Sequence, residues 1–340
     1  MKILVIIPVF NEEKNLEKCI NSFTNQTHKL SQITIVDDGS TDNTSQIGKR
    51  LEKSYKEILF IKKNDSESIA SPGKKIIQAF NYGLNKSNKN YDLIGKFDAD
   101  IELPKNYFEQ MVNIFSKNKS IGLASGIISV NEKGNWVVES IYNKNHVRGG
   151  LKLYNKSTFN QIDGLTESMG WDTLDEMKIY YSRKETFVDH SIICKQHRLT
   201  GERYNKKRYI KQGRVMYLLG YDIVLCLIGS IKFSFTENAI RPFFDSIYGY
   251  FNSLYKNEKK LVNNKLSKFV RSYRYQKILE KIGIYKLMLI NNILNGHIIK
   301  TKLLVNNSNL FWCCFRIYKF NNTFPFFFKY RTNWVSKANH

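Results

Sequence analysis

Residues 33–40 read ITIVDDGS, and residues 91–100 read YDLIGKFDAD. Each stretch contains a short run rich in aliphatic residues, followed by two aspartates close together: Asp37 and Asp38 in the first, Asp98 and Asp100 in the second. Such runs are typical of strands buried in a parallel sheet, and ligands of these sheets bind beyond the carboxyl ends of the strands. The two acidic clusters are therefore predicted to lie at one ligand-binding edge of an α/β fold.

Strand and helix patterns alternate on either side of these stretches. Apolar runs predict strands at 3–7, 33–36, 58–61 and 91–97, and helical spacing of apolar residues predicts helices at 16–23, 74–84, 104–115 and 173–181. Further strands and loops are expected within 121–155. The alternation predicts a mostly parallel central sheet with helices on both faces.

The sequence lacks the two common phosphate-binding loops. No G-x-G-x-x-G follows the first strand, and no G-x-x-x-x-G-K-[ST] occurs, which disfavours a dinucleotide-binding Rossmann domain and a P-loop NTPase. Asp98 and Asp100 are instead spaced to reach one divalent metal, which would bridge the diphosphate of a nucleotide sugar. Either acidic motif alone could equally well have only a structural role, ending a strand and capping a helix. The presence of both motifs after strands of one sheet favours a metal site.

In combination these motifs resemble those of family 2 glycosyltransferases of the GT-A fold. The resemblance covers residues 1–180 and is carried by IPVFNEE at 7–13, VDDGSTD at 36–42 and FDAD at 97–100, with Ala79, Asn81 and Gly83 in a helix between them. It implies an inverting transfer of a hexosyl or related sugar from a nucleotide-diphosphate sugar, with Mn²⁺ or Mg²⁺ as cofactor.

The resemblance also implies roles for individual residues. Asp98 would lie near the ribose and the metal, and Asp100 would bind the metal directly. Lys74 or Lys75 is expected near the diphosphate. The nucleotide pocket would be lined by Pro8, Glu12, Asp37 and Asp38, of which Asp38 reads the base.

Inverting transfer needs a base that takes the proton from the acceptor hydroxyl. In the family this is often the Asp of a Glu-Asp pair late in the catalytic domain, and here residues 170–176 read GWDTLDE, so that Trp-Asp replaces Glu-Asp. Asp172 is the expected catalytic base and Asp175 the second candidate. Alternatively, Asp172 only caps the helix expected at 173–181.

Four further residues have two interpretations each. His197 and Arg198 could contact phosphates of the donor or acceptor, or lie on a basic surface loop. Trp136 and Trp171 could stack on a sugar ring or belong to the core. No Q-x-x-R-W motif occurs, so the processive polysaccharide synthases of the family are a poor match.

Charge is unevenly distributed along the 340 residues. Residues 1–190 contain 26 Lys and Arg against 24 Asp and Glu, whereas residues 191–340 contain 27 against 6. We therefore expect a catalytic domain at 1–200 and a basic, largely helical C-terminal region at 201–340. Its surface would suit nucleic acid, anionic lipid or phosphorylated substrates.

The C-terminal region suggests contact with a membrane. The apolar run 215–231 could span a bilayer, lie on it or pack in a core, and Asp222 near its middle makes spanning costly. Basic residues next to aromatic clusters at 311–315 and 324–328 favour an anionic membrane surface. The acceptor would then be a glycan or a lipid-linked sugar, used in cell-surface glycan synthesis.

Cysteine usage and the N-terminus favour the cytoplasm, at the inner face of the cell membrane. The five cysteines form no C-x-x-C pair, which indicates a reducing compartment, and the apolar run 3–7 is too short for a signal peptide.

Two other classes fit less well. A sugar-nucleotide-forming nucleotidyltransferase would need a Gly-rich loop with a basic residue after the first strand, where residues 8–11 read PVFN. A basic nucleic-acid-binding or membrane-binding protein without catalysis remains the other alternative. No recognised nucleic-acid module is present, so no nucleic-acid partner is expected.

Overall fold

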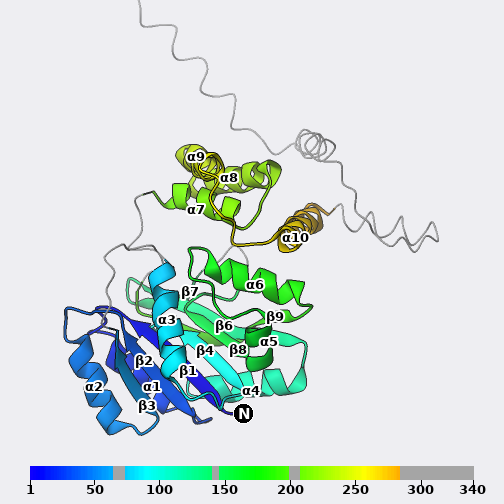
Figure 1. The fold of residues 1–340 in the computed structure, drawn as a ribbon. Coiled ribbons are helices and arrows are strands. Elements are labelled where there is room, and N and C mark those ends of the chain that lie inside the picture. Colours follow the sequence, from blue (N-terminus) through cyan, green and yellow to red (C-terminus); the bar gives the residue numbers. More distant parts are fainter. Residues whose placement is uncertain (64–72, 140–144, 199–206, 284–340) are drawn as a thin grey trace, which may run out of the picture.

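The computed structural model describes residues 1–63, 73–139, 145–198 and 207–283 (Figure 1). A sheet flanked by helices forms the lower part of the molecule in this view, and a layer of helices, α7 to α10, lies above it.

The first hundred residues alternate strands and helices as predicted. The elements are β1 (Ile3–Val9), α1 (Leu16–Thr24), β2 (Gln32–Asp37), α2 (Thr44–Ser54), β3 (Ile58–Lys62), α3 (Lys74–Lys86), β4 (Leu93–Phe97) and the short β5 (Ile101–Glu102). The strand limits predicted from the apolar runs lie within two residues of the observed limits. All seven residues of β1 are buried, as expected for a central strand covered on both faces.

The rest of the sheet is built from α4 (Tyr107–Lys117), β6 (Ile121–Glu132), β7 (Asn135–Val138), β8 (Leu151–Asn155), α5 (Lys156–Gln161), α6 (Trp171–Tyr181) and β9 (Glu185–Gln196). The strand order is β3-β2-β1-β4-β8-β6-β9-β5, with β7 paired to β6. Strands β3, β2, β1 and β4 are parallel. Beyond β4 the sheet is mixed, because β8 is antiparallel to both β4 and β6.

Helices cover both faces of the sheet, as predicted. Ile3, Val5 and Ile7 of β1 belong to an apolar core with α1 and α4. Leu4 and Ile6 point to the opposite face and belong to a second core with α3, α5 and α6. The alternation of side chains along β1 thus supplies both cores.

The layer above the sheet consists of α7 (Arg208–Leu218), α8 (Ile223–Glu237), α9 (Arg241–Tyr255) and α10 (Asn264–Ile282). It shares an apolar core with α6. Leu174 and Met177 of α6 pack in one cluster with Val215 of α7 and with Leu266 and Val270 of α10. Helix α6 therefore contacts the sheet on one side and the helical layer on the other.

The apolar run 215–231 is divided between two helices. Asp222 caps α8, because its carboxylate accepts a hydrogen bond of 2.9 Å from the backbone N–H of Leu225. Within the described residues, no helix combines the length and apolarity that crossing a bilayer requires. The aromatic clusters 311–315 and 324–328 lie outside the described residues.

Helices α7 and α9 approach each other through small residues. A Cβ added to Gly213 would lie 1.9 Å from the carbonyl oxygen of Ser246, and one added to Gly249 would lie 2.0 Å from that of Ile210. Both contacts are with backbone atoms, which cannot rotate away. The spacing of these two helices therefore depends on glycine at both positions.

We predict that Gly249→Ala lowers the free energy of unfolding by about 1–3 kcal/mol, since the added methyl group forces α7 and α9 apart. Gly229→Ala in α8 is the matched control. Its Cβ meets only the flexible end of Met216, at 2.9 Å from Sδ, and we expect little change or a gain. Urea denaturation measures both, and equal stabilities of the two variants would contradict the prediction.

Candidate functional site

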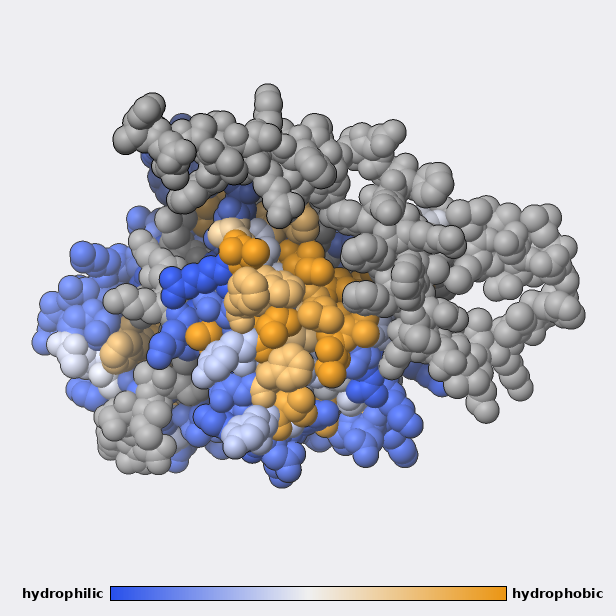
Figure 2. All heavy atoms as spheres, turned by 90° about the horizontal axis from the view of Figure 1, so that it is seen from above, coloured by the Kyte–Doolittle hydropathy of each residue, from blue (hydrophilic) through white to orange (hydrophobic). Residues whose placement is uncertain are grey.

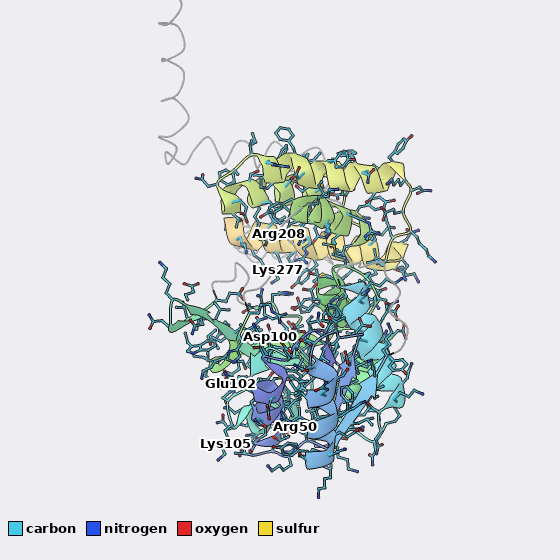
Figure 3. All side chains as sticks on the ribbon, turned by 90° about the vertical axis from the view of Figure 1, so that its left-hand side faces the viewer. Arg50, Asp100, Glu102, Lys105, Arg208 and Lys277 are labelled. Carbon is cyan, nitrogen blue, oxygen red and sulfur yellow. The ribbon has the colours of Figure 1, made fainter. Side chains whose placement is uncertain are left out.

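The loops that follow β1 and β4 meet the end of β9 at the carboxyl edge of the parallel strands. The carboxylate of Glu12 accepts two hydrogen bonds, of 2.7 and 2.5 Å, from Nη2 of Arg198. The Asp100 carboxylate accepts one of 3.3 Å from Nε2 of Gln196, and the Asp100 carbonyl accepts one of 3.0 Å from the backbone N–H of His197. Residues that are distant in sequence thus converge near Asp100, whose position is labelled in Figure 3.

Asp98 and Asp100 form the acidic centre of this edge. Asp98 is 30% exposed and forms an ion pair with Lys96. Asp100 is buried, and burial together with the charge of Asp98 raises its pKa to about 6. A carboxylate whose ionisation is disfavoured by a neighbouring carboxylate is suited to share a divalent cation with it. The described residues hold no cluster of three or more potential ligands, so such a cation would need oxygens from the donor phosphates and water.

The residues expected in the nucleotide pocket differ in accessibility. Pro8 is buried within β1. Asp37 is fully buried, and its carboxylate accepts hydrogen bonds from the Ser40 N–H, at 2.8 Å, and from the Ser45 hydroxyl, which fixes the loop before α2.

Two further residues of that pocket lie nearer the surface. Asp38 pairs with Lys63 at 3.2 Å beside the end of β1, where its N–H donates to the Val9 carbonyl. Lys74 is exposed on the first turn of α3.

His197 and Trp136 lie together at the rim. Nε2 of His197 is 3.1 Å from the Glu102 carboxylate, and the imidazole ring packs against the edge of the Trp136 ring with centroids 5.3 Å apart. Trp136 is 38% exposed on β7 and Trp171 is buried. The interpretation as a core residue is therefore wrong for Trp136 and correct for Trp171.

A glycine pair lies between the acidic centre and the start of α6. A Cβ added to Gly150 would lie 2.5 Å from Oδ2 of Asp98, and one added to Gly149 would lie 3.5 Å from Cβ of Asp172. The backbone of this turn therefore contacts the Asp98 side chain and passes close to Cβ of Asp172. It brings the candidate metal ligand and the candidate base to one site.

Two buried lysines connect the same regions through Trp171. Lys96 on β4 and Lys152 on β8 are register partners, and their ammonium groups lie 5.4 and 5.3 Å from the centre of the Trp171 ring. Lys96 pairs with Asp98, and Lys152 donates to both carboxylate oxygens of Asp175 at 2.9 Å. Two buried cations thus link the acidic end of β4 to α6.

Sequence reasoning missed Lys96, Lys152, His146 and Gly150. A lysine within the apolar run LIGKF at 93–97 was the available signal, because a charge in a buried strand requires a partner. The other three could not be assigned from spacing, since their partners lie on elements that the fold brings together.

The two candidate bases have different surroundings. Asp172 lies in the first turn of α6, and its side chain is 37% exposed. Desolvation opposes its ionisation, but His146, at 3.8 Å, and Lys152 outweigh this effect and lower its pKa to about 2. Asp175 is buried, which raises its pKa to about 6 despite the ammonium of Lys152, and it also accepts a hydrogen bond from the Tyr154 hydroxyl. Asp172 is ionised and reachable, whereas Asp175 belongs to an internal ion pair.

His146 bridges two acids of α6. Its Nδ1 is 2.9 Å from Oε1 of Glu176, and its Nε2 faces Asp172. Burial alone would lower its pKa, but the two acids outweigh this and raise the pKa from 6.5 to about 9. The imidazole is therefore charged at neutral pH.

We predict that the ionic contacts of His146 with Asp172 and Glu176 stabilise the fold at neutral pH and not in alkali. Because the pKa of His146 is higher in the folded chain than in the unfolded one, its contribution is complete below pH 6.5 and disappears as the pH rises through about 9. The native chain should lose at most about 3 kcal/mol more unfolding free energy over this range than His146→Gln. Denaturation at a series of pH values tests this, with exposed His190→Gln as control; parallel curves for the native chain and His146→Gln would contradict it.

A mixed sheet whose parallel strands end in an acidic edge, with a carboxylate-bearing helix across a glycine turn, has the α/β architecture of GT-A-type domains. The family model for glycosyl transferase family 2 matches residues 4–168. This part of the chain is a family 2 glycosyltransferase domain, as the sequence motifs indicated.

Curated relatives agree with this family. Glycosyltransferase GlyA of Streptococcus pneumoniae serotype 4 is 29% identical over 217 residues, which are 56% of this chain and 30% of GlyA. Poly(ribitol-phosphate) beta-N-acetylglucosaminyltransferase TarP of Staphylococcus aureus is 26% identical over 265 residues, or 76% of this chain and 75% of TarP. Several relatives are much longer proteins, and the matched stretch spans 21–30% of three of them.

A solved structure supports the fold. GalNAc-T7 with UDP, GalNAc and Mn²⁺ superposes with a TM-score of 0.52 at 15% identity, covering 68% of this chain and 50% of GalNAc-T7. The likeness confirms the GT-A-type α/β architecture.

Proposed function

We propose that this chain is an inverting glycosyltransferase that moves a sugar from a nucleotide-diphosphate sugar to a hydroxyl of a glycan or lipid-linked acceptor. The observation that carries the proposal is the position of the Gly149–Gly150 turn between Asp98, which it contacts, and Asp172, which it passes closely. Asp98 would then serve the departure of a metal-bound diphosphate, and Asp172 would take the proton of an acceptor hydroxyl. The family 2 match supports the same chemistry.

Asp98 and Asp100 would hold Mn²⁺ or Mg²⁺ between them. Carboxylate oxygens suit these hard cations. Because the described residues form no group of three or more potential ligands, donor phosphates and water would supply the other ligands. When bound, the metal would neutralise the diphosphate as it leaves. Within the chain, Lys96 offsets the charge of Asp98, and the buried Asp100 is oriented by Gln196.

Several residues would contact the donor. Arg198 is held by Glu12 beside Asp100, where its guanidinium matches phosphate oxygens. Asp38 would read the base, at the end of the strand next to β1. Pro8, Asp37, Lys74 and His197 would complete the pocket, with Asp37 acting through the loop that it fixes.

Asp172 would accept the proton of the acceptor hydroxyl. A pKa of about 2 keeps its carboxylate ionised over the physiological range, and 37% of the side chain is exposed. His146 and the Gly149 backbone would hold it in position. The engagement of Asp175 by Lys152 and Tyr154 argues for a structural role instead.

Residues 1–200 would form the catalytic domain, and residues 201–340 would attach it to the cytoplasmic face of an anionic membrane. The excess of basic residues after position 190 supports this location. A lipid-linked acceptor in polysaccharide synthesis would be reached there, and nucleotide-sugar donors would be available. A reducing compartment would suit the five cysteines, of which Cys19, Cys194 and Cys226 are buried free thiols in the described part of the chain.

We predict that Mn²⁺ together with at least one nucleoside diphosphate, from a panel of nucleotides and nucleotide sugars, raises the melting temperature of the chain. Asp100→Asn should abolish this shift and sugar transfer, since it removes a charged ligand from a site with few ligands. Asp245→Asn in α9 is the control and should behave as the native chain. An unchanged metal-dependent shift in Asp100→Asn would exclude the metal assignment.

We predict that Asp172→Asn lowers transfer by roughly 10²–10⁴-fold while donor binding and stability stay nearly unchanged, because the amide cannot accept a proton. Asp175→Asn should instead lower the free energy of unfolding by about 3–5 kcal/mol, because it leaves the buried Lys152 without a charged partner. Transfer rates, donor binding and urea denaturation of both variants distinguish the two roles. A stable, donor-binding and inactive Asp175→Asn would identify Asp175 as the base.

A further inference from the structure

Helix α9 packs against the helical layer through small residues and Tyr250, and most of its other aromatic residues face outward. Ser246, Gly249 and Ser253 are buried against the helical layer, and both serines are 0% exposed. Tyr248 and Tyr255, on the opposite face, are 61% and 90% exposed. A helix at the surface of a protein in water normally buries its large apolar side chains, so this orientation is the reverse of the usual one.

Helix α8 continues the same surface. Ile223, Ile231 and Phe235 are exposed at helical spacing, while Ser230 is fully buried and receives a hydrogen bond of 2.8 Å from the hydroxyl of Ser246. Seen from above, the described residues of the two helices present one contiguous apolar area (Figure 2). We call this area the α8–α9 face; it consists of Ile223, Ile231, Phe235, Phe244, Tyr248 and Tyr255.

The charges around this face identify its partner. Residues 207–283 contain 15 Lys and Arg against 5 Asp and Glu. Lys232, Arg241 and Lys256 are exposed on α8 and at the two ends of α9, and α10 supplies a further basic helix beside α8. An apolar area with basic residues at its margins matches an anionic bilayer. Acyl chains would contact the apolar side chains, and anionic headgroups would contact the basic residues.

We propose that the α8–α9 face inserts into the headgroup and acyl boundary of an anionic bilayer, with both helices parallel to the membrane plane. This rests on the membrane role proposed above and assigns it to a surface. The face is the outermost part of the helical layer (Figure 1).

The position of the candidate site agrees with this orientation. Asp100 lies below Arg208 of α7 and Lys277 of α10, and above Arg50 and Lys105 (Figure 3). The acidic centre is therefore on the side of the sheet directed at the helical layer. A chain held by the α8–α9 face would turn this side of the sheet toward the membrane that carries a lipid-linked acceptor.

The test is sedimentation of the full chain with phosphatidylcholine vesicles that do or do not contain about 30 mol% phosphatidylglycerol. Phe244→Ser/Tyr248→Ser should lower the partition coefficient about tenfold or more, because two aromatic side chains leave the boundary. The loss should persist at about 1 M salt, where electrostatic adhesion is screened. Val137→Ser/Val138→Ser on β7 removes exposed apolar side chains elsewhere and should bind as the native chain does.

Insertion depth gives a second measurement. Tyr248→Trp should add fluorescence that acyl-chain-brominated lipid quenches, whereas Phe187→Trp on β9 should add fluorescence that is not quenched. Equal partitioning of the native and Phe244→Ser/Tyr248→Ser chains would overturn the proposal. So would a dimer that these substitutions dissociate without changing vesicle binding, because a second copy would then cover the face.

Failure of the proposed function would look different. A native chain that binds no vesicles would refute the membrane role together with the α8–α9 face. The shift in melting temperature with Mn²⁺ and a nucleotide, measured on the same sample, reports separately on the transferase site.

Discussion

Lys96 and Lys152 carry two positive charges into the interior of the sheet, side by side on β4 and β8. A buried charge without a partner costs several kcal/mol, so each lysine requires an acid and a polarisable neighbour. Lys96 has Asp98, Lys152 has Asp175, and the ring of Trp171 lies against both ammonium groups. These pairings fix the acidic end of β4 relative to the start of α6. The separation between the candidate metal site and the candidate base follows from them.

Helix α6 extends this constraint to the rest of the molecule. Trp171 belongs to the core that the sheet shares with α3 and α5, whereas Leu174 and Met177, one and two turns later, belong to the core of the helical layer. Because protein interiors are close-packed, α6 cannot shift against one core without disturbing the other. Attachment of the helical layer to a surface would therefore also orient Asp172. A displacement of the C-terminal helices would therefore also displace the edge of the sheet at which Asp172 lies.

The parts of the fold that the sequence predicted correctly are those that local patterns determine. Buried parallel strands appear as uninterrupted apolar runs, and the aspartates after β2 and β4 stood out because polar residues follow such runs abruptly. The insertion of β8 between β4 and β6 depends on pairing between distant segments, which no local pattern encodes. His146 shows the same limit. Its partners Asp172 and Glu176 lie on a helix whose position only the folded chain defines.

The orientation of α9 is a feature that the sequence analysis did not predict. Most of the aromatic residues of this helix face outward, whereas its small residues and Tyr250 face inward, and burial in water would favour turning the larger apolar side inward. The fold instead uses Gly213 and Gly249 to bring two helix backbones into direct contact, a mode of packing that gains dispersion energy and needs no large side chains. Such packing leaves Phe244, Tyr248 and Tyr255 outside, where water would oppose their exposure. The arrangement is energetically reasonable when the outer side of α9 faces a phase other than water, which is the role that the proposed insertion into an anionic bilayer would give it.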